Sequence, residues 1–200
     1  MGISLQQFEQ MKQRAGGVRR RPAEPDAAPV QSRRHGVVLG VDPSLRGTGY
    51  GIINVAGAQP VCLAQGTIKV PATWERSRCL TLIAQTLRDV IRAHEPTACA
   101  IEGLFYAQNM QTTLIMGEAR GAALVAAGEA GLEIYELAPR RVKQAIVGYG
   151  AAQKLAVAKM VQRLLGLAET PAPDAADALA VALAYVQDNR RAVLAPAKRI

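Results

Sequence analysis

Two short apolar runs of this chain each end in an acidic residue. GVVLGVD (36–42) ends at Asp42, and TACAIE (97–102) ends at Glu102. Uninterrupted apolar runs of about four to eight residues are typical of buried strands. If the two strands are parallel neighbours, their carboxyl ends lie at the same edge of one sheet, and the two acidic side chains meet there. The pair therefore favours a sheet with acidic groups gathered at one edge.

The remaining patterns place these two strands in a larger sheet flanked by helices. Further strands are predicted over 48–55, 61–70 and 132–138, and helical spacing predicts helices over 74–94, 110–130, 139–147, 151–165 and 174–187. The first three strands follow one another through turn residues, which favours an antiparallel meander. Strands then alternate with helices, so we expect an α/β fold with a five-stranded mixed sheet flanked by helices.

Two more acidic residues, Asp174 and Asp177, lie three apart in PDAADALAVALAYV and so share one face of a helix. Asp174 follows Pro173, and a helix N-cap is an alternative role for it. Asp177 lies inside an otherwise apolar helix, where a charged group is expected to be paired or liganded. If this helix end packs over the sheet edge, four carboxylates share one cleft, where they stay ionised together only with cations.

The chemistry of such a cluster follows from its ligand atoms. Oxygen ligands favour Mg²⁺ or Mn²⁺ over softer metals. Two such ions about 4 Å apart can activate a water, hold a phosphate and neutralise the departing oxygen. The four acidic residues therefore favour a metal-dependent reaction on a phosphate ester.

The positive charge of the chain is unevenly distributed. Of the net charge of +8, the first 35 residues carry +4 and residues 186–200 carry +3. Between 137 and 168 there are six basic residues and no acidic one, namely Arg140, Arg141, Lys143, Lys154, Lys159 and Arg163. Such a block is typical either of a surface that binds a polyanion or of a solvated helix face. Together with the carboxylates, it favours metal-dependent phosphodiester hydrolysis.

Composition argues against several other classes of protein. No apolar run approaches the roughly 20 residues of a membrane-spanning helix, and the first 21 residues lack the apolar core of a secretory signal. The three cysteines show no metal-binding spacing, so we expect no disulfide scaffold or zinc site and a cytoplasmic location. We expect a domain over 36–188, with a disordered basic extension over 1–35 and a flexible basic tail over 189–200. A basic arm that contacts nucleic acid is the alternative for the extension.

Five segments of the chain stand out together: GVVLGVDPSLRGTGYGII, AIEGLFYAQN, GEARGAALVAA, RRVKQAIVGYGAAQK and PAPDAADALAVAL. In this order they resemble the RuvC family of Holliday-junction resolvases, and the resemblance covers residues 36–186. It implies a ribonuclease-H-like fold and a homodimer that cuts four-way DNA junctions by paired, symmetric nicks in recombination and repair. It also implies cooperation with the branch-migration proteins RuvA and RuvB.

The resemblance also implies roles for individual residues. The family's four metal-binding carboxylates correspond to Asp42, Glu102, Asp174 and Asp177, with two Mg²⁺ expected per site and Mn²⁺ as a substitute. The family's active-site lysines correspond to Lys143 and Lys154, which contact the region of the scissile phosphate. Phe105 corresponds to an aromatic residue that inserts among junction bases, and Tyr106 is the alternative. Further DNA contacts are expected in the basic block at Arg140, Arg141 and Lys159.

Three other activities compete with this one. The first is another ribonuclease-H-like nuclease. The second is a sugar-kinase-like ATPase, because the segment DPSLRGTGYG resembles the phosphate-binding loop of that class. A chain of 200 residues is, however, too short to include the second domain that such an enzyme needs. The third is a non-catalytic DNA-binding module, which gains nothing from four anions beside a phosphate. The helix with Gly117 and Gly121 suits either a dimer surface or ordinary packing against the sheet.

Overall fold

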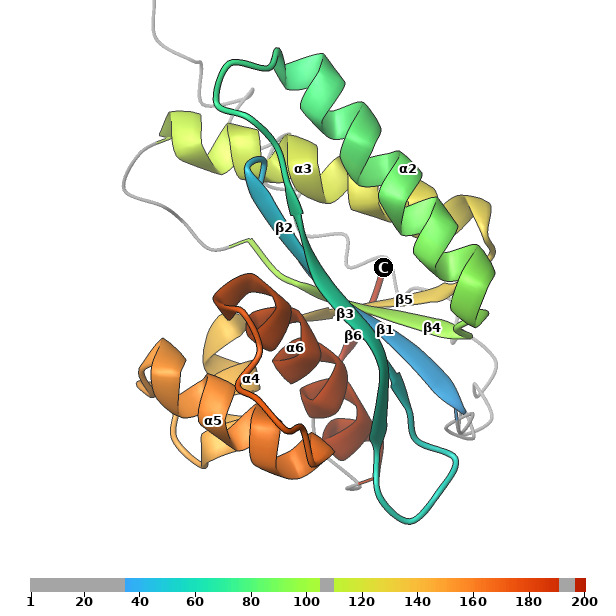
Figure 1. Ribbon diagram of the computed structural model, residues 1–200, viewed down its shortest axis with the longest axis vertical. Coiled ribbons are helices and arrows are strands. Elements are labelled where there is room, and N and C mark those ends of the chain that lie inside the picture. The colour runs from blue at the N-terminus through green and yellow to red at the C-terminus, as the bar shows by residue number, and fades with distance from the viewer. Residues whose placement is uncertain (1–34, 105–109, 191–196) are drawn as a thin grey trace, which may run out of the picture. The chain divides into compact units, whose positions relative to one another are not determined.

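A computed structural model describes residues 35–104, 110–190 and 197–200, which all belong to one unit of the chain. Its elements follow in the order β1 (Val37–Asp42), β2 (Gly47–Asn54), β3 (Val61–Lys69), α2 (Arg76–His94), β4 (Ala98–Glu102), α3 (Met110–Glu129), β5 (Glu133–Leu137), α4 (Pro139–Val147), α5 (Lys154–Leu165), α6 (Pro173–Arg190) and β6 (Lys198–Arg199) (Figure 1). None of the helices described is long and apolar enough to cross a membrane.

The sheet has the strand order β3-β2-β1-β4-β5-β6. β1, β2 and β3 pair antiparallel, β1 and β4 pair parallel, and β4 and β5 pair parallel. The predicted α/β fold, its mixed sheet and its antiparallel meander are therefore confirmed. Val41 is the register partner of Ile101, so Asp42 and Glu102, the next residues along, both lie at the carboxyl edge of the parallel strands.

The predicted number of strands in the sheet is wrong, because the described residues form a sheet of six strands. The additional strand, β6, lies within the stretch 189–200 that we expected to be a flexible tail, and α6 itself continues to Arg190. β6 pairs antiparallel with β5 through Arg199 opposite Tyr135 and Lys198 opposite Glu136. Two residues show no apolar periodicity, so only their pairing with a distant strand makes them a strand.

Helices cover both faces of the sheet (Figure 1). Side chains alternate between the two faces of a strand, and each face has its own apolar core. Val38, Ala98 and Ala100 pack on the face with α4, α5 and α6. Leu39 and Ile101 pack on the opposite face with α2 and α3. The residues of β1 and β4 that alternate with Val41 and Ile101 therefore face α6.

α6 lies directly against β1 and β2 because glycine and alanine leave room for its backbone. Gly40 and Gly51 are register partners in these strands. A β-carbon at Gly40 would lie 2.1 Å from the carbonyl oxygen of Ala178, and one at Gly51 would lie 2.5 Å from Leu179 Cδ2. The missing side chains thus determine how closely the N-terminal half of α6 approaches the sheet.

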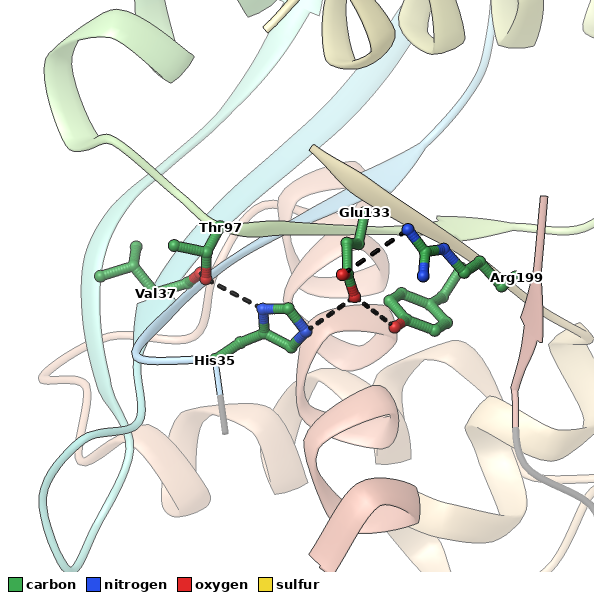
Figure 2. Close-up of polar contacts among 6 residues, drawn as sticks. His35, Val37, Thr97, Glu133 and Arg199 are labelled. Carbon is green, nitrogen blue, oxygen red and sulfur yellow. Dashed lines mark hydrogen bonds and ion pairs between the residues drawn. The ribbon is translucent and has the colours of Figure 1, made fainter. Parts of the chain in front are cut away.

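At the amino ends of the parallel strands, a polar cluster joins the two ends of the described domain (Figure 2). His35 Nδ1 lies 3.0 Å from Thr97 Oγ1, and His35 Nε2 lies 3.4 Å from Glu133 Oε2. The Glu133 carboxylate also accepts a 2.7 Å hydrogen bond from the Tyr135 hydroxyl and forms a 3.6 Å ion pair with Arg199. His35, which we assigned to the extension, therefore packs against the domain.

Replacing Glu133 by alanine is expected to lower the free energy of unfolding by about 2 kcal/mol, because its partners lose a half-buried charged acceptor. Glu129→Ala is the matched control, since Glu129 pairs with Arg88 at the exposed surface, where ion pairs contribute at most about 1 kcal/mol. Urea denaturation of both variants measures the difference. Equal losses of stability would contradict a structural role for the cluster.

Candidate active site

Asp42 and Glu102 end two adjacent parallel strands and face the same side of the sheet. Two residues before Asp42, the missing β-carbon of Gly40 points at α6, and two residues before Glu102, Ala100 packs in the core formed with α6. By the alternation of side chains along a strand, both carboxyl groups face the layer that contains α6. The predicted meeting of these two acids at one sheet edge is therefore the arrangement that the structure has.

The other two acidic residues lie on the first turns of α6. The helix begins at Pro173, whose fixed backbone angle suits a first helical position, and Asp174 lies in its first turn. β2 runs against this helix end: a β-carbon at Gly49 would lie 1.9 Å from the carbonyl oxygen of Asp174, and one at Gly47 would lie 3.0 Å from its Oδ2. Asp177 follows one turn later, close enough for its charge to act on both Asp42 and Glu102.

Asp42 and Glu102 interact strongly with each other. Their side chains lie close enough to act on each other directly. Burial, above all, raises the pKa of Asp42, and the charges of Asp177 and Asp174 raise it further. Burial also raises the pKa of Glu102, followed by the charge of Asp42. The four carboxyl groups thus belong to one electrostatic unit that is short of positive charge.

Lys154 supplies the positive charge that the structure places in this cluster. It is the first residue of α5, and its Nζ donates a 2.7 Å hydrogen bond to Asp177 Oδ2. This hydrogen bond, above all, raises the pKa of Lys154, and the charges of Asp42 and Glu102 add to the effect. Of the two predicted lysines, Lys154 therefore contacts the carboxylates directly, whereas Lys143 lies half-buried in α4.

The other predicted DNA contacts lie on the two helices after β5 or outside the described residues. Arg141 forms a 2.6 Å ion pair with Asp188 of α6, which ties α4 to α6. Arg140 packs beside Gly150, and Lys159 is exposed on α5. Phe105 and Tyr106 are the two that lie outside the described residues.

The donor chemistry of the cluster fits a hard divalent cation. All its ligand atoms are carboxylate oxygens, which Mg²⁺ and Mn²⁺ prefer. Burial, above all, and then the charges of the neighbouring acids raise the pKa of Asp42 and of Glu102, and a bound cation would favour their charged forms. Among residues 35–104, 110–190 and 197–200, no three or more His, Cys, Asp or Glu side chains are arranged to hold a metal ion. Lys154 pairs with one of the four carboxylates, that of Asp177.

The glycines of β2 are site residues that the acidic and basic patterns of the sequence did not reveal. Gly47 and Gly49 border Asp174, and Gly51 borders Leu179 of the same helix. The signal is present in the segment GTGYG, because glycine at every second position removes the side chains from one face of a strand. That pattern indicates a strand face against which another backbone packs closely.

Comparisons with known proteins agree with this geometry. The sequence matches the family described as crossover junction endodeoxyribonuclease RuvC over residues 38–185. It is 46% identical over 148 residues to the crossover junction endodeoxyribonuclease RuvC of Heliobacterium modesticaldum, covering 74% of this chain and 91% of that protein. The RuvC of Coxiella burnetii is 46% identical over 154 residues, covering 77% of this chain and 89% of that protein.

A solved structure described as T. thermophilus RuvC in complex with Holliday junction substrate superposes with a TM-score of 0.76 at 36% identity. The match covers 83% of this chain and all of that one. The sequence and structural comparisons thus agree, and the resemblance inferred from the five segments is confirmed. This chain belongs to the RuvC family of crossover junction endodeoxyribonucleases.

Proposed function

We propose that the chain resolves Holliday junctions by hydrolysing phosphodiester bonds at the four-carboxylate site. Membership of the RuvC family makes it an endonuclease that acts on four-way DNA junctions. The observation that carries the assignment of the site is the convergence of Asp42, Glu102 and Asp177 with Lys154 at one sheet edge. This edge is also where the basic helices α4 and α5 begin.

In this proposal Asp42, Glu102, Asp174 and Asp177 hold two Mg²⁺ ions, for which Mn²⁺ can substitute. Such ions supply Lewis acidity and neutralise negative charge on the reacting phosphate. The chain's own contribution is to hold four anionic groups close together at the end of a rigid sheet. Because these groups repel one another, a divalent cation that binds between them relieves the repulsion and is bound more tightly.

Lys154 and Lys143 are proposed to contact the phosphate at the cleaved bond. Lys154 pairs with Asp177 through a long, largely exposed side chain, so it can move to a phosphate oxygen when a cation takes its place. A lysine is suited to this role because its ammonium group is a compact, mobile charge. Its charge would then balance the negative charge that develops as the bond breaks.

The surface formed by α4 and α5 is the proposed path of the DNA backbone. Neither helix has an acidic residue in its first turn or a side-chain cap at its N-terminus. Basic residues near a helix N-terminus oppose the helix dipole, so the dipole does not explain Arg140 and Lys154 there. A phosphate backbone explains them, because it binds both to basic side chains and to helix N-termini. Phe105 or Tyr106 is proposed to stack on an unpaired junction base.

A homodimer would match the two-fold symmetry of paired cuts. The outer face of α3 carries Met110, Leu114 and Val125, which are 75%, 61% and 52% exposed, and nothing lies within 4 Å of a β-carbon at Gly121. These four residues share one helix face, and an isologous interface pairs such a face with its own copy. We propose this stripe as the dimer surface, with RuvA and RuvB as partners of the assembled enzyme.

Cleavage of a labelled four-way DNA junction tests the proposal, with linear duplex as the control substrate. We expect symmetric, paired nicks in Mg²⁺ and no detectable product in EDTA, because the carboxylates without cations repel the phosphate. Binding without cutting in both Mg²⁺ and Mn²⁺ would favour a non-catalytic binding module. Equal cutting of the duplex would retain the carboxylate chemistry but contradict specificity for junctions.

A further inference from the structure

Arg46 fastens the loop that follows Asp42 to a different part of the chain. Its Nη1 donates to the carbonyl oxygen of Pro71 at 2.6 Å and to Cys79 Sγ at 3.2 Å, and its Nη2 donates to the carbonyl oxygen of Trp74 at 3.2 Å. Pro71 and Trp74 lie in the connection between β3 and α2, and Cys79 lies in α2 itself. One guanidinium group therefore bridges two segments that are more than twenty residues apart.

The residues on either side of Arg46 hold the same loop from within. Leu45 is buried in a small apolar cluster with Val70 and Cys79. Thr48 is fully buried, and its hydroxyl donates to the carbonyl oxygen of Ser44 at 2.5 Å and accepts from the Ser44 amide at 3.3 Å. Thr48 thus holds the loop in shape from within, whereas Leu45 and Arg46 pack and hydrogen-bond against the connection from β3 to α2 and the start of α2.

This loop borders two carboxylates of the active site. Asp42 precedes it as the last residue of β1, and Gly47 follows it with its missing β-carbon 3.0 Å from Asp174 Oδ2. A shift of the loop would therefore move Asp42 relative to α6 and change the space available to Asp174. The three acceptors of Arg46 are two carbonyl oxygens and a sulfur, so its effect on the carboxylates passes through the loop.

We propose that Arg46 is a positioning residue of the active site, which sets the separation of Asp42 from Asp174 by fixing the loop between β1 and β2. The inference rests on the proposed function of the carboxylates. Arginine is required because its planar group presents several N–H donors in a fixed arrangement, whereas the single ammonium of lysine cannot span the three acceptors.

The test compares Arg46→Ala and Arg46→Lys with Arg92→Ala. Arg92 is the matched control, because it pairs with Asp89 on the surface at the other end of α2. We expect Arg46→Ala to lower the single-turnover rate at saturating junction by roughly 10- to 100-fold, since small misplacements of reacting groups cost about this much. Junction affinity should stay within about twofold, and the affinity for Mn²⁺, measured by calorimetry without DNA, should fall.

Arg46→Lys should show the same losses even if the alanine variant does not fold, because it keeps the charge but not the three hydrogen bonds. An unchanged rate and unchanged Mn²⁺ affinity would overturn the proposal. So would weaker junction binding with an unchanged rate at saturation, because Arg46 would then be a DNA contact. If the wild-type chain itself fails to cut junctions, the proposed function fails, and the Mn²⁺ measurement still decides whether Arg46 organises the carboxylates.

Discussion

Asp177→Asn is expected to lower the rate of junction cleavage by at least about 100-fold, the effect typical of removing one preorganised charge-stabilising group from an active site. The substitution keeps the shape of the side chain but removes its charge. Asp177 is 19% exposed and accepts a hydrogen bond from Lys154, and its charge acts on both Asp42 and Glu102. Without this charge, the cluster binds cations less tightly, and Lys154 loses its carboxylate partner.

Junction binding by this variant should be unchanged or tighter, because one negative charge is removed from the path of a polyanion. Asp89→Asn is the matched control, since Asp89 is exposed at the far end of α2, where it pairs with Arg92. Single-turnover cleavage and gel-shift titrations in EDTA separate the two effects. Lost binding with retained cleavage would show that Asp177 is not part of the cation site.

Gly49→Ala is expected to damage both stability and activity. The new methyl carbon would lie 1.9 Å from the carbonyl oxygen of Asp174 and 2.5 Å from its carbonyl carbon, and a backbone cannot yield as the tip of a flexible side chain can. The first turn of α6 must therefore move away from β2. We expect a loss of about 2 kcal/mol or more in unfolding free energy, as for other overpacked interiors.

The same displacement should lower cleavage by about 100-fold, because it moves Asp174 and Asp177 relative to Asp42. Gly128→Ala serves as the control, since nothing lies within 4 Å of a β-carbon at that position in α3. Urea denaturation and single-turnover cleavage measure the two effects. A Gly49→Ala variant as stable and as active as Gly128→Ala would show that close contact between β2 and α6 does not hold the site together.

Much of the fold could be predicted from local patterns. Apolar runs and helical spacing predicted every strand of the sheet except β6, and the described helices, to within a few residues at each end. The parallel pairing of β1 with β4 was only a condition in the sequence argument, under which Asp42 and Glu102 meet, and the structure shows that pairing. β6 could not be predicted, because its two residues become a strand only by pairing with β5.

The candidate site divides in the same way. The positions of Asp42 and Glu102 at strand ends, and of Asp174 and Asp177 on one helix face, are visible in the chain because acidic residues interrupt apolar patterns. The pairing of Lys154 with Asp177 and the engagement of Arg141 with Asp188 are not, since a block of basic residues looks alike whether its members bind DNA, a helix or one another.

The sequence by itself determined the order of the elements from β1 to α6, the acidic residues that interrupt the apolar patterns, and the family, because these depend on residue type and on spacing along the chain. Only the tertiary structure decided which groups touch. Arg46 donates hydrogen bonds to Pro71 and Trp74, and the missing side chain of Gly49 leaves room for the backbone of Asp174. Both contacts join segments that are far apart in the chain. Such contacts arise when the sheet and α6 pack together, and no local pattern of side chains encodes the distances between them.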